Sequence, residues 1–414
     1  MKNNVTHRIQ LAAVLVFAGS IPGVFANGFR LPDQDGFATA RGEAFAATAD
    51  NASAIYYNPA GIAQLDGMNL RAGLYSTYLD PTFSPPGGGA TYHNQDKLVA
   101  VPQFYATLTP NDSRVSFGFG VFAPFGLGVN WPEKTGFRSV AIKGSLKYIT
   151  AAPVIALKLA PNFMIGGGPN IDYAAVDLRQ GLTPTPNNDY FRFRGDGFDL
   201  GYSLGALWQP TEKVSLAAVF RSSSQPNLKG HTTSEMDSVQ PRESSKANAD
   251  FTFPLNAVFG VSYRPTKLWN VEFDADYMDW NQVQDVNIHQ DTPSTVVPIS
   301  NIPFALEWKS SWLYEFGATR YFGNGWQVSA GYVYNENSMP NKHYTPFAAD
   351  LDRHVFSVGT GYKGQKYSFD IAYQCSYGPD HVVKGSAPSL SGQSADGTYG
   401  FLSHVILLSV GVHF

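Results

Sequence analysis

The chain ends in Ile406-Leu407-Leu408-Ser409-Val410-Gly411-Val412-His413-Phe414, with a large apolar side chain at every second position. Successive side chains of a β-strand point to opposite faces of the sheet. The strand predicted here therefore has one continuous apolar face, made of Ile406, Leu408, Val410, Val412 and Phe414. A helix would need a period near 3.6, which this stretch lacks. The pattern indicates a terminal β-strand that meets an apolar medium along one side.

The same period of two recurs earlier in the chain. In 271–277, Val271, Phe273, Ala275 and Tyr277 alternate with Glu272, Asp274 and Asp276. Comparable runs begin at Leu306, Trp326 and Tyr367. The run from Leu306 is predicted to place Leu306, Trp308, Trp312, Tyr314, Phe316 and Ala318 on one face. These alternations predict long, half-apolar strands rather than helices.

Short turn signals separate pairs of these strands. They are Pro110-Asn111-Asp112, Pro161-Asn162, Pro210-Thr211-Glu212, Pro265-Thr266-Lys267, Gly323-Asn324-Gly325 and Lys363-Gly364-Gln365. Between the resulting hairpins we expect longer loops, at 81–96, 125–139, 180–189, 231–247, 286–302, 338–350 and 379–398. Short turns at one end and long loops at the other are typical of an outer-membrane barrel. Six turns plus the first and last strands predict an all-β, antiparallel transmembrane barrel of about fourteen strands.

A secreted β-sandwich would also alternate, so it is the alternative fold. The predicted strands are longer than sandwich strands, which average nearer five or six residues. Tryptophans near strand ends suit the aromatic girdles of a barrel, and they are Trp208, Trp269, Trp280, Trp308, Trp312 and Trp326. The apolar last strand that closes on Phe414 resembles the signal by which the barrel-assembly machinery recognises its substrates. These features favour the barrel, which we expect to be a monomer surrounded by outer-membrane lipid.

Composition restricts the function. The 414 residues are 43% apolar and 15% charged, with a formal net charge of −4, and the mean hydropathy is −0.17. These values argue against a helical membrane protein and against a basic nucleic-acid surface. The single cysteine, Cys375, excludes an internal disulfide and a cysteine-cluster metal site. No spacing marks a catalytic triad, and Asp274, Asp276 and Asp279 lack the glycine of a calcium loop, so we expect no enzyme activity, metal or cofactor.

The chain begins like an exported protein. Lys2, His7 and Arg8 precede an apolar run from Leu11 to Val24, and Val24-Phe25-Ala26 resembles a cleavage site. We expect a signal peptide over 1–26, cut after Ala26, and an outer-membrane location. Residues 27–66 do not alternate, whereas residues 67–414 do. A fourteen-stranded barrel is roughly 28 Å wide between backbones, and because side chains cannot fill that width, we predict that 27–66 form a plug.

The plug segment carries a family resemblance. Asn27-Gly28-Phe29, Asp50-Asn51-Ala52-Ser53 and Asn58-Pro59-Ala60-Gly61 resemble the amino-terminal hatch of FadL-type long-chain fatty-acid transporters, a family that includes toluene channels. The stretch 121–128, Val-Phe-Ala-Pro-Phe-Gly-Leu-Gly, resembles the family's third strand and following loop. The resemblance implies a hatch over 27–66, a barrel over 67–414, and passive uptake of apolar molecules through a lumen pocket. It also implies hatch movement and a sideways exit beside a kinked third strand.

The resemblance assigns candidate roles to particular residues. Asn58, Pro59 and Ala60 match the hatch motif, and our hypothesis is that they brace the plug against the wall; the alternative is an ordinary turn. Gly118, Gly120 and Pro124 are candidates for the kink and lateral gate. Phe122, Phe125, Leu127 and Trp131 are candidates for an outer capture groove, or for interface aromatics.

Several substrates fit this interpretation. Long-chain fatty acids are the main hypothesis, and an aromatic hydrocarbon channel is the rival within the family. A porin for polar solutes and a surface receptor or adhesin without transport are the rivals from other classes. Charges expected in the lumen, such as Arg192, Arg194, Glu307 and Lys309, either pair with one another or meet a substrate carboxylate, and the sequence does not separate these roles.

Overall fold

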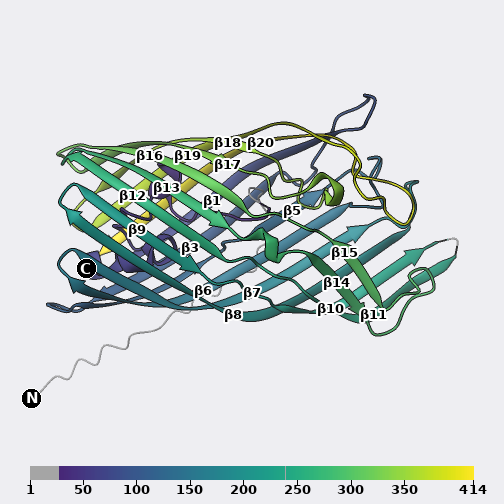
Figure 1. Ribbon diagram of the computed structural model, residues 1–414, viewed down its shortest axis with the longest axis horizontal. Helices are drawn as coiled ribbons and strands as arrows, with labels where there is room; N and C mark the ends of the chain where they lie inside the picture. Colours follow the sequence, from purple (N-terminus) through teal and green to yellow (C-terminus); the bar gives the residue numbers. More distant parts are fainter. Residues whose placement is uncertain (1–27, 238) are drawn as a thin grey trace, which may run out of the picture.

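The fold is a closed antiparallel β-barrel (Figure 1). The computed structural model describes residues 28–237 and 239–414, so the expected signal peptide 1–26 and its cleavage after Ala26 lie outside the described residues. The first strand, β1 (Gly67–Ser84), pairs with the last, β20 (Gly397–His413), from Asn69↔His413 to Ser84↔Thr398. This pairing closes the sheet and leaves no free edge between the two strands.

Within the described residues the wall has fourteen antiparallel strands, which confirms the fold expected from the sequence. Nine of them are single elements: β1, β3 (Leu98–Thr109), β6 (Lys143–Ala160), β7 (Phe163–Gln180), β8 (Tyr190–Thr211), β17 (Trp326–Asn335), β18 (Arg353–Lys363), β19 (Tyr367–Val383) and β20. Five are interrupted and consist of two segments: β4 (Val115–Phe122) with β5 (Gly126–Asn130), β9 (Val214–Arg221) with β10 (Asn227–Met236), β11 (Gln240–Asp250) with β12 (Asn256–Thr266), β13 (Trp269–Met278) with β14 (Asp285–Gln290), and β15 (Asn301–Ala305) with β16 (Ser311–Tyr321).

Three short helical elements precede the wall and lie inside it. They are α1 (Gly36–Ala40), α2 (Ala54–Tyr57) and the 3-10 helix η1 (Pro59–Gln64). The two-residue strand β2 (Tyr92–His93) pairs antiparallel with the end of β1. Two further 3-10 turns, η2 (Trp280–Gln282) and η3 (Asn341–His343), lie between wall segments. No helix among residues 28–237 and 239–414 is long and apolar enough to span a membrane.

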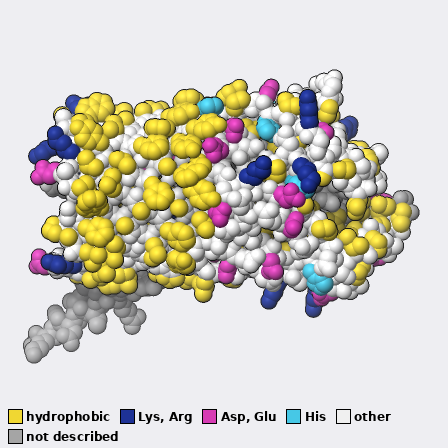
Figure 2. Space-filling model, in the orientation of Figure 1, with side chains coloured by type: hydrophobic (Ala, Val, Ile, Leu, Met, Phe, Trp, Pro, Cys, Tyr) yellow, Lys and Arg dark blue, Asp and Glu magenta, His cyan; other side chains and the backbone are white. Residues whose placement is uncertain are grey.

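An apolar belt surrounds the half of the barrel that carries the short turns and the carboxyl terminus (Figures 1 and 2). On β8 the outward side chains Phe198 and Leu200 are each 70% exposed. Aromatic residues mark the two rims of the belt, where Phe163 pairs with Trp208 and Tyr173 pairs with Phe198. The step of about ten residues along β8 from Phe198 to Trp208 gives a belt about 25 Å tall at a tilt of about 40°, which matches the apolar band of outer-membrane barrels.

The wall continues well beyond the belt, where the sequence predicted loops. The expected loop 231–247 contains most of β10 and β11, and the expected loop 286–302 contains most of β14 and the start of β15. The prediction failed because the alternation inverts outside the membrane: the interior becomes apolar and the exterior polar. On β8, Phe191 and Phe193 are buried inside while Arg194 points outward with 62% of its side chain exposed.

The same inversion corrects two other sequence predictions. Arg192 and Arg194, which we expected in the lumen, lie on the outer surface of β8 and pair with Asp177 of β7. Trp280 and Trp308, which we expected in a girdle, are 0% and 2% exposed in the interior. Trp308 and Trp312 do not share a strand face, because residues 306–310 separate β15 from β16.

Closure of the barrel predicts a role for the terminal residue. The amide of Phe414 donates to the Met68 carbonyl at 2.9 Å, and the Met68 amide donates to the Phe414 carbonyl at 3.3 Å. We predict that deletion of Phe414 lowers the amount of heat-modifiable, folded barrel in outer-membrane fractions several-fold, whereas Phe414→Tyr keeps it. Leu390→Ser, in an exposed loop, is the control. Unchanged levels after the deletion would contradict the prediction.

Candidate functional site

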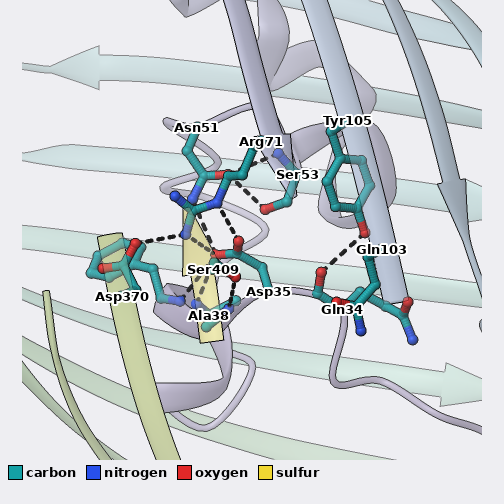
Figure 3. A network of polar contacts seen from close by, with 12 residues as sticks. Gln34, Asp35, Ala38, Asn51, Ser53, Arg71, Gln103, Tyr105, Asp370 and Ser409 are labelled. Carbon is teal, nitrogen blue, oxygen red and sulfur yellow. Dashed lines mark hydrogen bonds and ion pairs between the residues drawn. The ribbon is translucent and has the colours of Figure 1, made fainter. Parts of the chain in front are cut away.

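The hatch is anchored to the closing seam of the barrel through Asp35 (Figure 3). Asp35 is the N-cap of α1, and its Oδ1 accepts from the amides of Phe37 at 3.0 Å and Ala38 at 3.4 Å. The same carboxylate pairs with Arg71 of β1, whose guanidinium also binds Asp370 of β19 at 2.6 Å. One buried network therefore satisfies a helix terminus and ties it to two wall strands.

A row of acids on β13 holds the next part of the hatch. Glu272 Oε1 accepts from the amides of Ala47 at 2.7 Å and Thr48 at 3.1 Å. Asp274 Oδ2 accepts from the amides of Phe45 at 2.9 Å and Ala46 at 2.8 Å. Four buried amides without helical partners thus find acceptors on the wall. The inward alternation of these acids accounts for them without a metal, and the described residues contain no cluster of metal ligands.

The segment Asn58-Pro59-Ala60 lies against β7 and β8. Asn58 Nδ2 donates to the Ala46 carbonyl at 2.9 Å and to the Ala206 carbonyl of β8 at 3.1 Å, while its Oδ1 accepts from the Ala60 amide at 3.1 Å. Gly166 and Gly205 leave room for this contact. A Cβ at Gly166 would lie 2.5 Å from the Pro59 carbonyl oxygen, so a side chain there would displace the hatch backbone.

The third wall strand is broken between β4 and β5, at residues 123–125. β4 pairs with both β3 and β6, whereas β5 pairs with β6, and the described residues show no ladder between β5 and β3. The break lies between the Phe122↔Thr150 and Gly126↔Lys147 pairs, at the level of the outer aromatic rim. The wall is therefore interrupted where it meets the edge of the apolar belt.

The amino-terminal segment fills this break from the inside. The Leu31 amide donates to the Pro124 carbonyl at 2.8 Å, and the Gly126 amide donates to the Phe29 carbonyl at 2.8 Å. Gln34 Nε2 donates to the Ala123 carbonyl at 2.9 Å. These bonds satisfy the backbone groups that the interrupted ladder leaves open, so the amino terminus and the broken strand form one unit.

The kink candidates divide between two roles. Pro124 lies in the break itself. Gly118 and Gly120 lie within β4, where an added Cβ would approach Ile55 of the hatch at 3.1 and 2.9 Å. The structure therefore places these two glycines at a close contact with α2 rather than at the interruption.

Phe29 sits in a cage of aromatic side chains. It is 3% exposed. Its ring centroid lies 4.8 Å from that of Trp280, 5.4 Å from those of Phe251 and Trp308, 5.7 Å from that of Phe253 and 5.9 Å from that of Phe125. Three of these neighbours are edge-on and two are tilted, and contacts of this kind stabilise an aromatic ring beyond its area burial. The cage is therefore an apolar enclosure, and the chain's own Phe29 fills it.

A cavity of about 40 Å³ adjoins the cage behind the broken strand. Its apolar wall includes Phe122, Phe125 and Phe253, and Arg30 and Arg221 also line it. Its other lining residues are Tyr56, Pro124, Tyr148, Thr150, Asn170, Asp172, Ser222, Ser224, Pro254, Asn256 and Met278. This volume holds a few water molecules, whereas ligand sites usually measure hundreds of Å³. A larger guest therefore requires the hatch segment to move.

Of the two cationic side chains of the cavity, Arg30 is buried and Arg221 is half-buried, and the two are differently paired. Arg30 forms an ion pair with Asp276 of β13. Arg221 bonds the Tyr56 carbonyl and Asn256 Oδ1, and its guanidinium lies 4.6 Å from the centre of the Tyr56 ring. Arg221 thus has neutral partners, and no carboxylate in the described residues forms an ion pair with it.

The hatch also buries two acids next to each other. Asp33 and Glu43 are both buried and interact electrostatically, and Tyr57 donates to Glu43 Oε2 at 2.6 Å. Burial raises the pKa of Asp33 to about 6, and burial together with the neighbouring Asp33 raises the pKa of Glu43 well above its usual value. The pair is satisfied when it keeps a proton between the two carboxyls.

The three groove candidates whose side chains the structure describes do not lie at one outer surface. Phe122 and Phe125 line the internal cavity. Trp131 is 1% exposed, and its Nε1 donates to the Pro346 carbonyl at 2.9 Å beneath the loops. The side chain of Leu127 lies outside what the structure describes. Of the charges expected in the lumen, Glu307 is 51% exposed in the segment between β15 and β16.

The sequence did not reveal the residues that form the cage, or those that bond the segment 29–34 to the broken strand. Phe29 entered only as part of a motif, and Gln34 and Arg221 carried no signal of their own. Gly166 and Gly205, the wall glycines against Pro59, had no structural role assigned from the sequence. Only the acids at 272–276 were detectable, as inward positions of an alternating strand.

Comparison with known proteins agrees with this architecture. Residues 17–414 match the family described as outer membrane protein transport protein (OMPP1/FadL/TodX). The chain belongs to this family. It is thus an outer-membrane channel for uptake of hydrophobic compounds rather than an enzyme.

Individual relatives are distant. The long-chain fatty acid transport protein of Escherichia coli is 21% identical over 376 residues, which cover 80% of this chain and 82% of that protein. A crystal structure of a Pseudomonas aeruginosa FadL homologue superposes with a TM-score of 0.82 at 19% identity, covering 94% of this chain and all of that one. The Ralstonia pickettii toluene transporter TbuX gives a TM-score of 0.72 at 16% identity, covering 94% and 99%. At these identities the solved structures establish the fold.

The contact between the hatch and the wall glycines predicts a leaky variant. We predict that Gly166→Val pushes Pro59 from the wall, because the new Cβ meets backbone rather than a flexible side chain. Single-channel conductance of the purified protein in planar bilayers should rise at least several-fold. Gly136→Val, with nothing within 4 Å of the added Cβ, is the matched control. A Gly166→Val barrel that stays closed would show that this contact does not hold the hatch.

Proposed function

We propose that this channel takes up long-chain fatty acids by passive diffusion through the Phe29 cage. The observation that carries the proposal is the position of the cage beside a cavity that is apolar on one side and lined by Arg30 and Arg221 on the other. An apolar chain with one anionic end matches both parts of this lining. The similarity to the fatty acid transport protein of Escherichia coli supports the same substrate class.

The proposed first step is displacement of Phe29 by the apolar chain of the substrate. A sixteen-carbon fatty acid has roughly 15 methylenes or methyls beyond its carboxyl, and keeping them from water is worth about 0.8 kcal/mol each. That sum, on the order of 12 kcal/mol, exceeds what one buried phenylalanine contributes, about 3 kcal/mol. An incoming chain can therefore replace the Phe29 ring in the cage.

The proposed second step follows from the backbone bonds of the same segment. Movement of Phe29 breaks the bond from Gly126 to its carbonyl and strains the neighbouring bond from Leu31 to Pro124. The inner cover of the break at 123–125 is thereby removed. Because the break lies at the rim of the apolar belt, the chain can leave sideways into lipid without crossing water.

Asn58, Pro59 and Ala60 act in this proposal as the fixed side of the hatch. Their contacts to β7 and β8 hold the rear of the plug, so that only the segment around Phe29 needs to move. Pro124 marks the exit, and Phe122 and Phe125 line the passage to it.

A direct test compares three solutes. Purified protein in liposomes should take up labelled oleate faster than toluene, and should admit no labelled small sugar. Phe29→Asp should lower oleate uptake about tenfold or more, because it places an additional charge in the cage. Phe322→Asp, an exposed aromatic at a short turn, is the control for added charge. Sugar flux without oleate uptake would refute the proposal.

The aromatic cage favours one second candidate, an aromatic hydrocarbon channel. The side chain of Phe29 is itself a benzyl group, so the space it occupies fits a single aromatic ring. The two candidates differ in their need for a cation, since toluene has no carboxylate.

We predict that Arg221→Met lowers oleate uptake about tenfold and leaves toluene uptake within about twofold of wild type. The reason is that Arg221 lacks an ion-paired carboxylate and is available to a substrate carboxylate. Arg264→Met, at the short-turn end of β12, serves as the matched control, and heat-modified gel mobility checks assembly. Equal losses of oleate and toluene uptake would instead show that Arg221 acts by holding Tyr56 in place and not by binding the substrate carboxylate.

A further inference from the structure

A basic face covers the outside of the barrel just beyond the apolar belt. It consists of three neighbouring rows across β6, β7, β8, β10 and β11. In register, the first row is Lys147, Ala175, Asp196, Lys229 and Asn248; the second is Ser145, Asp177, Arg194, His231 and Lys246; the third is Lys143, Arg179, Arg192, Thr233 and Ser244. The rows carry seven lysines and arginines against two carboxylates, in a chain whose net charge is −4.

Internal ion pairs do not neutralise this face. Arg192 and Arg194 share the single carboxylate of Asp177, at 2.5 and 3.2 Å. The contact of Arg194 uses its Nε, and the side chain is 62% exposed. Among the described residues, the ion pairs of this face with loop acids fall in the third row, where Glu133 lies 3.5 Å from Arg179 and Asp96 lies 3.9 Å from Lys143. Lys147, Lys229 and Lys246 form no ion pair within the described part of the chain.

The register places like charges side by side. Arg179 is directly opposite Lys143 on β6 and directly opposite Arg192 on β8. Like charges opposite each other in a sheet destabilise it. An arrangement of this kind is stabilised when an external anion bridges the cations, and exposed guanidinium and ammonium groups bind phosphate most effectively.

The height of the basic face decides which anion it meets. The first row lies two residues beyond Phe198 of the outer rim, or about 5 Å along the barrel axis, and the third row lies about 15 Å beyond it. The headgroup layer of a bilayer begins at this height. Because long loops of such barrels face outward and short turns face the periplasm, the basic face lies at the level of the outer leaflet.

We propose that the basic face is a binding site for the phosphorylated head of the outer-leaflet glycolipid, lipopolysaccharide. The phosphates bind Arg194, Lys229 and Lys246, and the acyl chains lie along the apolar belt beneath Phe198. The site borders the exit, since Lys147 pairs with Gly126 directly after the break in the third strand. It is independent of which hydrophobic compound the channel carries.

The test uses a triple variant, Lys147→Gln, Lys229→Gln and Lys246→Gln, whose lysines form no ion pair in the described structure. The matched control is Lys213→Gln, Lys267→Gln and Lys363→Gln, which removes three exposed lysines at the short-turn end. Fluorescent lipopolysaccharide, intact or enzymatically dephosphorylated, is titrated into each protein in nonionic detergent. Heat-modified gel mobility confirms assembly, and Lys246→Gln alone is the variant used if the triple does not fold.

Wild type and control should bind intact lipopolysaccharide about tenfold or more tightly than the dephosphorylated form, with affinity falling as salt rises. The triple variant should lose about tenfold or more of this affinity, and Lys246→Gln alone about threefold. Equal binding of both glycolipids, or equal affinity of triple variant and control, overturns the proposal. Competition by phosphatidylglycerol micelles as strong as by lipopolysaccharide also overturns it, because the face would then attract anionic lipid of any kind.

Discussion

The structure depends on one constraint: a wide barrel must be filled without leaving buried backbone amides and carbonyls unpaired. A segment of irregular chain inside the lumen carries amides and carbonyls that must find partners away from water. The wall supplies them from fixed inward positions, with Glu272 and Asp274 accepting four hatch amides and Asp35 joining α1 to Arg71. Buried charges are costly alone, but here each one satisfies a group that would otherwise remain unpaired. The hatch is consequently part of the same hydrogen-bonded unit as the wall.

The same constraint links the plug to the interruption of the third strand. A break in a membrane barrel exposes backbone groups that lipid cannot satisfy. Pairing of the chain around Phe29 with 124–126 solves this problem from inside, and it also fixes the Phe29 ring in its cage. Occupancy of the cage and cover of the break therefore depend on one short segment. This is the physical basis for expecting that a guest in the cage alters the wall beside it.

The sequence predicted the strands correctly within the apolar belt and poorly in the part of the wall beyond it, and one physical reason explains both results. Within the membrane, alternation marks lipid-facing apolar positions, and Phe198 and Leu200 follow that rule. Beyond the membrane the outside is water and the interior is a packed aromatic core, so the rule reverses: Phe193 faces inward and Arg194 outward. Arg194 was consequently expected in the lumen, and Trp280 was expected in a girdle. A period of two reports alternation but not which medium lies on each side.

The sequence by itself determined the class of fold, the number of strands and the family, because periodicity, turn spacing and short motifs are local properties of the chain. Tertiary structure alone decided the site. The cage around Phe29 contains residues as far apart in the sequence as Phe125 and Trp308. A hydrogen bond likewise joins Gln34 to the distant Ala123 carbonyl. Contacts between residues so far apart in the sequence produce no periodic pattern in it, because each partner needs only to fit a position that the closed barrel creates.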